Sequence, residues 1–136
     1  MPKQPDTVTT EYIEAYRLGV LIRTPIENIA FFHAEHKAVV AHTKSNGQFT
    51  LQIPLWSIEK TLKRSFILAH RSYLVQRKLI PGRSHWRVGS AWEFEIITSV
   101  SYNGHQGLLP HRIPISRRLT SKVQAILRTN PLSEQP

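Results

Sequence analysis

Hydrophobic and polar positions along the chain change period several times, and most of the pattern is typical of short β-strands. Apolar runs at 20–23, 29–33 and 38–43 are rich in β-branched or aromatic residues. The segment 49–53 alternates, and Asn46-Gly47 before it is a strong hairpin signature. Two brief apolar pieces, 66–69 and 73–75, flank a polar turn. The first half of the chain therefore predicts short strands joined by tight turns.

Alternation is clearest in the last third of the chain. It covers 86–88 and 92–100, and Asn103-Gly104 then predicts a second hairpin. The pieces 108–109 and 112–115 are short strands, and the prolines beside them indicate the edge of a sheet.

A short helix is predicted before the first strand. Thr9 or Thr10 is a suitable N-cap for a helix over 11–18, which Gly19 would end. Tyr12, Ile13 and Tyr16 would share one face of this helix. We expect that face to pack on the core.

Two further helices are predicted later in the chain. Pro54 suits the start of one, because its missing N–H is not needed there. Ser116 suits the N-cap of the other, which ends near Asn130-Pro131. The apolar face of the first comprises Leu55, Ile58 and Leu62, with Phe66 as an optional fourth position. The apolar face of the second comprises Leu119, Val123, Ile126 and Leu127. The pattern as a whole predicts a mainly β domain of eight to ten short strands with two or three short peripheral helices.

The length bounds the organisation of the chain. Its 136 residues correspond to one domain, at roughly 150 residues per domain. We expect a tail and short helix at 1–19, the domain at 20–129 and a tail at 130–136. The absence of cysteine excludes disulfides and thiolate sites. No apolar run approaches the roughly 18 residues of a membrane span, and residues 1–6 lack the apolar stretch of a signal peptide. We therefore expect a cytoplasmic protein with no membrane contact.

Charge is distributed unevenly. Residues 1–59 contain five Lys or Arg and six Asp or Glu. Residues 60–128 contain 13 Lys or Arg but only two Asp or Glu. The second segment therefore carries a formal charge of +11, whereas the whole chain carries +9, because its other residues are net negative. This asymmetry favours a polyanionic partner, with nucleic acid first among the candidates.

Seven histidines raise the question of a metal site or catalysis. His33 and His36 flank Glu35, but on a strand the two histidines point to opposite faces. The spacing of the other histidines brings no two of them together, and the nine acids form no pair suited to a two-metal site. The sequence therefore predicts no enzyme, no metal and no cofactor.

Two basic segments are better candidates for function. His70-Arg71-Ser72 lies in a turn between two strand pieces, and Ser116-Arg117-Arg118 opens a helix. A helix N-terminus offers free N–H groups to a phosphate, and an arginine there can read guanine in the major groove. The alternative for Arg71 is a buried side chain paired with Glu59 or Glu27.

Three segments resemble the LytTR family of bacterial DNA-binding domains. They are Thr24–Thr43, Ile53–Val75 with its His-Arg-Ser-Tyr-Leu-Val end, and the Ile-Pro-Ile-Ser-Arg-Arg of 113–118. Together they cover about residues 20–128. Two departures are Gln76, where the family has Asn, and a longer 86–111 stretch, which predicts an extended hairpin.

The resemblance implies an elongated β fold that reads successive major, minor and major grooves through three loops. Carried over by position, the first loop is His36-Lys37, the second His70-Arg71-Ser72 and the third Arg117-Arg118. It also implies two copies on a direct-repeat site, with or without a homodimer in solution. Family members usually carry a sensory or receiver domain before this part. About 20 residues precede it here, so we expect a separate sensor or signalling partner.

The remaining basic residues are candidates for contacts with DNA phosphates, which would fix the position of the protein along the duplex. They are Lys60, Lys63, Arg64, Arg77, Lys78 and Lys122. The alternative function is a module for RNA or single strands, in which aromatic side chains stack on bases. Its platforms would be Tyr12, Trp86, Trp92 and Tyr102.

Overall fold

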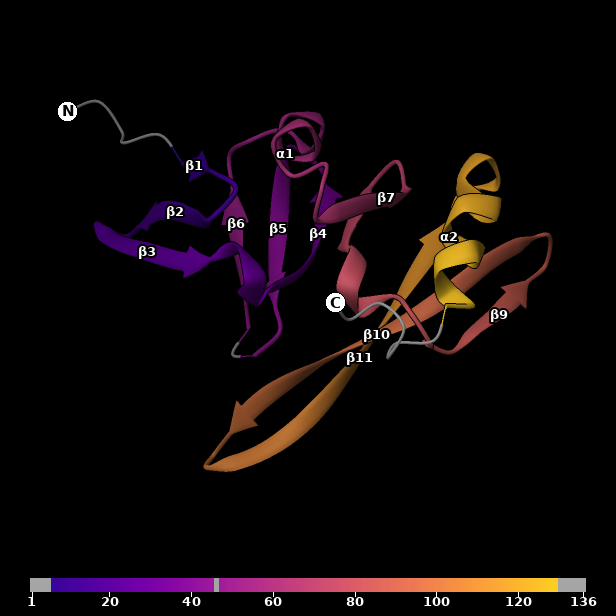
Figure 1. Cartoon of the computed structure of the whole chain (residues 1–136). Helices are drawn as coiled ribbons and strands as arrows, with labels where there is room; N and C mark the ends of the chain where they lie inside the picture. Colours follow the sequence, from indigo (N-terminus) through magenta and orange to yellow (C-terminus); the bar gives the residue numbers. More distant parts are fainter. Residues whose placement is uncertain (1–5, 46, 130–136) are drawn as a thin grey trace.

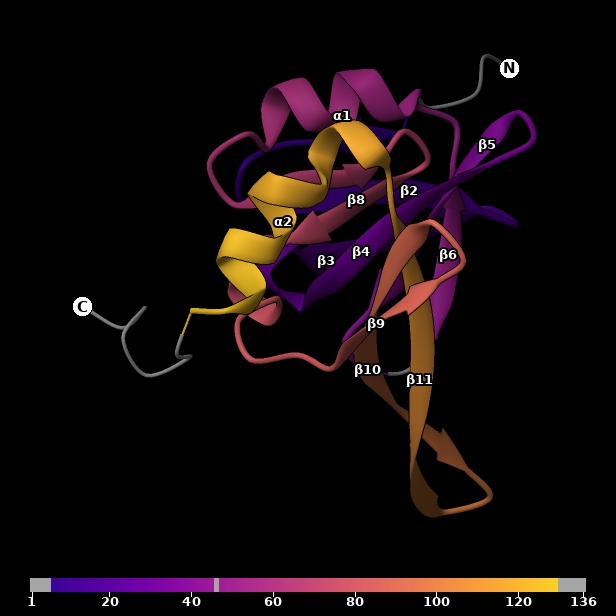
Figure 2. The same cartoon turned by 90° about the vertical axis from the view of Figure 1, so that its right-hand side faces the viewer.

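The computed structural model describes residues 6–45 and 47–129, and its β-sheets form three layers (Figures 1 and 2). The middle layer is a five-stranded antiparallel sheet with the order β6-β5-β4-β8-β7. Its strands are β4 (Ile29–Glu35), β5 (Ala38–Thr43), β6 (Gln48–Leu51), β7 (Phe66–His70) and β8 (Tyr73–Gln76). The predicted mainly β fold is confirmed, with eleven strands in the described residues where eight to ten were expected.

Both faces of the middle sheet are buried. In β4, Ile29 and Phe32 face one core cluster, whereas Ala30 and Phe31 face the other. A register shift between Ile29 and Phe31 produces this order. Because both faces are covered, the sequence of β4 is a continuous apolar run rather than an alternating one.

One face of the middle sheet is covered by the N-terminal elements. These are β1 (Thr7–Val8), β2 (Tyr12–Arg17), β3 (Val20–Pro25), the 3₁₀ turn η1 (Ile26–Asn28) and α1 (Leu55–Thr61). Pro54 is the N-cap residue of α1, and Leu55, Ile58 and Leu62 are buried, as predicted.

The helix predicted over 11–18 is wrong: residues 12–17 form β2. Ile13 and Ala15 are fully buried and alternate with more exposed neighbours, which is the period of a strand. Leu18 and Gly19 both have positive φ and form the two-residue turn between the paired Arg17 and Val20. Gly19 therefore serves a hairpin turn of the kind that glycine favours, not a helix end. The pairing of β2 with β3 joins residues before 19 to the domain.

The other face is covered by β9 (His85–Val88), β10 (Ala91–Tyr102) and β11 (His105–Ile115), with α2 (Thr120–Leu127). The short strand pieces predicted at 108–109 and 112–115 are one long strand. Asn103 and Gly104 form the predicted turn, both with positive φ. The predicted edge is also confirmed, because β11 is the outer strand of its sheet. Beyond the body, β10 and β11 continue as a two-stranded arm (Figure 2).

The last helix differs from its prediction at both ends. A 3₁₀ turn, η3 (Arg117–Leu119), comes first, and α2 ends at Leu127. Ser116 is the residue before η3, but its hydroxyl makes no cap; the Oγ is buried without a partner in the described residues. Its carbonyl instead accepts from Leu119 N. Val123 and Leu127 are buried, as predicted. Asn46, Asn130 and the segments 1–5 and 130–136 lie outside the described residues.

The strand assignment of 12–17 can be tested by two substitutions. Ile13→Ala empties a fully buried site, which typically destabilises a protein by about 2–5 kcal/mol. Tyr16→Ala removes a more exposed side chain and should lower the free energy of unfolding by less than about 1 kcal/mol. Denaturant unfolding of both variants measures the contrast. Equal losses would indicate that the two side chains share a buried helical face.

Candidate nucleic-acid interface

Three polar turns lie together at one end of the middle sheet. The first joins β4 to β5, the second joins β7 to β8, and the third leads from β11 into η3. Ala34 N donates to Ser72 O at 2.8 Å, which ties the first hairpin to the second turn. Ser116 N donates to Ala69 O at 2.9 Å, which ties the third turn to β7. The residues 36–37, 70–72 and 117 form a continuous feature, called the turn surface below.

The first turn consists of His36 and Lys37, between the paired Glu35 and Ala38. Both side chains are exposed. His36 has a φ of 54°, a conformation that non-glycine residues rarely adopt. The positive φ belongs to the tight hairpin turn, as it does at Leu18 and Asn103.

The second turn exposes Arg71 and braces it from behind. His70 is half-buried, and its Nδ1 accepts a hydrogen bond of 3.1 Å from Ser72 N. His70 thus fixes the turn in its neutral form, whereas Arg71 is the exposed group. The alternative of a buried Arg71 paired with Glu59 or Glu27 is wrong.

The third turn presents Arg117, which is exposed. Its Nη2 donates to Ser90 Oγ at 2.8 Å. Ser90 lies between β9 and β10, so a fourth turn holds the arginine. Sequence reasoning missed Ser90, because 27 residues separate the two side chains and no motif marks the pair.

A cluster of aromatic rings supports the turn surface from inside. His33 stacks on Tyr73 with ring centroids 4.2 Å apart, and His70 meets the edge of the same ring. Phe31 stacks on His42 at 4.2 Å. The rings of His42 and His111 lie 5.3 Å apart, although the sequence spacing gave no sign that histidines meet. This ring cluster comprises Phe31, His33, His42, His70, Tyr73 and His111.

The ring cluster keeps its histidines neutral. Burial is the main cause that lowers the pKa of His42 to about 4, and His111 and His33 act in the same direction. Burial also lowers the pKa of His33, His70 and His111. For His70, the neighbouring charges of Arg71 and His33 add to that effect. Neutral rings behind Arg71 leave the arginine as the positive charge of its turn.

The other basic residues predicted to contact DNA lie away from the turn surface. Lys63, Arg77, Arg118 and Lys122 line a cavity of about 540 Å³ beside β7, with Glu59 as an acidic neighbour. Arg118 therefore lies in this groove rather than on the turn surface. Arg64 and Lys78 lie at the other end of β7 and β8, where Arg77 N bonds Ser65 O. Lys60 is exposed on α1.

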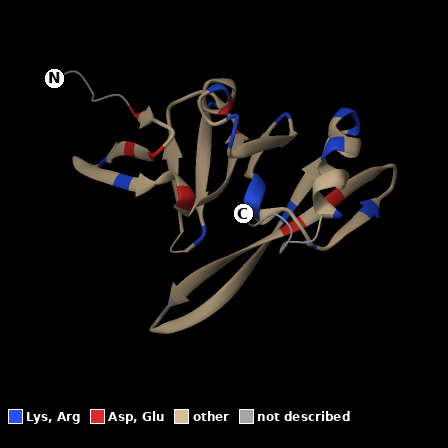
Figure 3. Cartoon of the chain, viewed as in Figure 1, with Lys and Arg blue, Asp and Glu red and all other residues tan. Residues whose placement is uncertain are grey.

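The described charged residues are confined to the body of the domain and are absent from the arm. Figure 3 shows basic segments on α1 and α2, whereas the arm formed by β10 and β11 carries neither basic nor acidic colour. Residues 96–111 contain no Lys, Arg, Asp or Glu. The arm is thus an uncharged extension of a basic body, and its exposed side chains include Leu108 and Leu109.

The stacking platforms of the alternative function are not free. Arg23 covers the ring of Tyr12 at 4.0 Å, Arg112 lies over Trp86 and Arg87 over Trp92. Trp86 Nε1 also donates to Glu93. The side chain of Tyr102 lies outside the described part of the structure. These contacts give the rings a structural role and do not favour base stacking.

Among the described residues, no group of three His, Cys, Asp or Glu is arranged to hold a metal ion. No helix in residues 6–45 and 47–129 is long and apolar enough to span a membrane.

Comparison with known proteins decides the family. The family model described as the LytTr DNA-binding domain matches residues 19–128. The chain belongs to the LytTR family. It therefore carries a DNA-binding domain of the kind found in transcription regulators.

A solved structure agrees with the fold of this LytTR domain. The chain is similar to the LytTr DNA-binding domain of a response regulator from Bacillus cereus, with 21% sequence identity and a TM-score of 0.64. The match covers 88% of this chain and 98% of that one. No curated protein matches the chain. The extended hairpin predicted from the family's usual length is the arm of β10 and β11.

The ring cluster of this LytTR domain predicts acid sensitivity. An unfolded chain protonates His42 near pH 6.5, whereas the folded one does so at about pH 4. The unfolded state therefore binds more protons between these values, and the free energy of unfolding falls as the pH drops through this range. Because the ring is only partly buried, we expect a loss of about 1–2 kcal/mol from His42.

Unfolding by denaturant at about pH 7 and about pH 4.5 measures this loss. His42→Phe keeps a stacked ring but removes the titrating group, so its stability should depend less on pH. An unchanged pH dependence in that variant would contradict the assignment to His42.

Proposed function

We propose that the chain is a sequence-specific regulator of transcription that reads double-stranded DNA with its turn surface. The observation that carries the proposal is the coupling of three exposed polar turns by the hydrogen bonds Ala34–Ser72 and Ser116–Ala69. Groups held on rigid strands keep their positions relative to one another, so they can match a fixed set of base edges. Flexible basic tails would provide affinity without that discrimination.

Each turn has a distinct role in this proposal. Arg117, oriented by Ser90, reads a guanine in the major groove. His36 and Lys37 read a second stretch of major groove. Arg71 enters the minor groove between them, where narrow A·T-rich DNA attracts arginine. Ser72 and His70 position Arg71, since their contacts are within the turn.

The basic residues beside the turn surface are proposed to contact phosphates and so to fix the position of the protein along the duplex. Arg118, Lys122 and Lys63 line one groove along β7 and are proposed to contact the DNA backbone. Arg77 lines both this groove and the cavity at the far end of β7, where Arg64 and Lys78 lie. The five residues of β7 span roughly 15 Å. We propose that Arg64, Arg77 and Lys78 add to the field that attracts DNA without contacting the base pairs that the turns read.

The unit of regulation extends beyond one chain. We propose that two copies occupy a direct-repeat site, with repeats spaced by about one helical turn so that both copies lie on one face of the duplex. We further propose that the regulator acts in the cytoplasm on the nucleoid. A separate sensor or signalling partner would control it.

Replacement of the reading arginines tests the proposal. Arg117→Ala and Arg71→Ala should each weaken binding to the preferred duplex by about 1–3 kcal/mol and relax the preference at one position. Lys78→Ala is the matched control: it removes one exposed charge at the far end and should retain the preference. Competition assays with the preferred duplex and a scrambled duplex at about 150 mM salt separate the two effects.

If Arg117→Ala discriminates between these duplexes as well as the parent does, the turn surface is not the reading surface. If Lys78→Ala loses as much discrimination as Arg117→Ala, the distinction between basic residues at the turn surface and those at the far end of β7 is wrong.

The first turn allows binding to be separated from stability. His36 has a positive φ, which glycine adopts without strain. His36→Gly should therefore leave the free energy of unfolding unchanged or raise it by up to about 1 kcal/mol. The same substitution should weaken binding to the preferred duplex. Chemical unfolding and a binding titration of one preparation measure both. A variant that is less stable yet binds normally would contradict a binding role for His36.

A further inference from the structure

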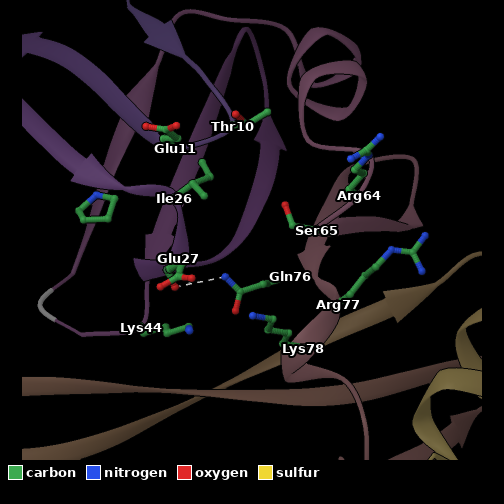
Figure 4. A pocket seen from close by; sticks show the side chains of 11 residues that line it. Thr10, Glu11, Ile26, Glu27, Lys44, Arg64, Ser65, Gln76, Arg77 and Lys78 are labelled. Carbon is green, nitrogen blue, oxygen red and sulfur yellow. Dashed lines mark hydrogen bonds between the residues drawn. The ribbon is translucent and has the colours of Figure 1, made fainter. Parts of the chain in front are cut away.

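A cavity of about 600 Å³ lies at the end of the middle sheet opposite to the turn surface (Figure 4). β4 begins beside this cavity and ends at the first turn, whereas β8 begins at the second turn and ends in Gln76 on the cavity wall. The volume lies within the range of small-molecule sites. None of its lining residues belongs to the turn surface.

Backbone hydrogen bonds form the walls of this far cavity. Ile26 N donates to Glu11 O at 2.9 Å, which joins the N-terminal layer to η1. Arg77 N donates to Ser65 O at 2.9 Å, and Lys44 N donates to Asn28 O at 2.7 Å. The wall residues come from five separate parts of the chain, and these bonds fix them to one another. Such a cavity is preformed rather than opened by a ligand.

The far cavity carries an excess of positive charge. Lys44, Arg64, Arg77 and Lys78 line it, against Glu11 and Glu27. The ion pairs among the described residues are Arg17–Asp6 and Arg23–Glu14, so none of these six side chains takes part in one. Four cations and two carboxylates leave a net charge of +2, which an anionic ligand would balance.

Gln76 supplies a fixed polar group at the wall. It is 4% exposed, and its Nε2 donates to Glu27 O and Ile29 O, both at 3.2 Å. These two bonds fix the orientation of the amide, yet Oε1 has no donor among the described residues. In Figure 4, Lys44 and Lys78 point toward Gln76 from two sides. Buried polar groups without partners are uncommon, and a bound molecule is one way in which they are satisfied.

We propose that the far cavity binds a small molecule that bears a phosphate group. The ammonium groups of Lys44 and Lys78 bind the phosphate oxygens, and the guanidinium groups of Arg64 and Arg77 add positive potential. Gln76 Oε1 accepts a hydrogen bond from an N–H or O–H group of the same ligand. This site goes beyond DNA reading, since it lies away from the turns that carry that function.

A titration of the ¹⁵N-labelled full chain tests the site. The probes are AMP and pyrophosphate, with adenosine as the uncharged control. We expect saturable shifts at the amides of Glu27, Ser65, Arg77 and Lys78, with a Kd for AMP below about 1 mM. Adenosine should bind at least about tenfold more weakly, because it lacks the phosphate.

The double variant Lys44→Ala/Lys78→Ala should weaken AMP binding by more than about tenfold. Lys37→Ala, which removes a base from the turn surface, is the matched control and should bind AMP as the parent does. Both changes affect charged side chains that are not fully buried, so the spectra should show the parent fold.

Three results would overturn the proposal. They are no saturable shift with AMP or pyrophosphate up to about 10 mM, shifts spread over all basic residues alike, or equal AMP binding by the double variant and the parent. The double variant should retain the parent's preference among duplexes. A loss of that preference would assign these lysines to DNA instead, whereas failure of AMP binding alone leaves DNA reading intact.

Discussion

Two backbone hydrogen bonds hold the turn surface together. Ala34 N–H bonds Ser72 O, and Ser116 N–H bonds Ala69 O, so turns from three distant parts of the sequence share one frame. The frame is stiff because the middle sheet is buried on both faces, with Phe31 and Phe32 of one strand in separate cores. A β-strand buried on both sides has little freedom to shift its register. The exposed side chains at the end of the sheet are therefore held at fixed positions relative to one another.

The ring cluster explains how positive charge is concentrated at the tips. The ring cluster contains four histidines, and burial lowers the pKa of each, which keeps the rings neutral near pH 7. A cluster of charged imidazoles there would repel one another and destabilise the layer between the sheets. The neutral rings pack as aromatic groups instead, so the strands can approach closely behind Arg71.

Local patterns predicted most of the fold. The hairpin at Asn103-Gly104, the helix after Pro54 and the strands of the middle sheet all follow from short-range propensities and turn chemistry. The segment 11–18 was misassigned because Tyr12, Ile13 and Tyr16 fit helical spacing, while the burial of Ile13 and Ala15 depends on tertiary packing. The basic segments at 70–72 and 116–118 were candidates from the residues themselves, whereas His36 and Lys37 came from the family resemblance. Their arrangement followed from neither, because the contacts of Arg117 with Ser90 and of His42 with His111 join residues far apart in sequence.

Selection from a random double-stranded DNA library at about 150 mM salt, where non-specific phosphate binding is weak, tests the central claim most directly. Rigid reading of base edges by three turns predicts one enriched motif, present as direct repeats spaced by about one helical turn. Failure to enrich any motif, with binding that disappears as salt rises, would show a basic surface that holds DNA without reading it.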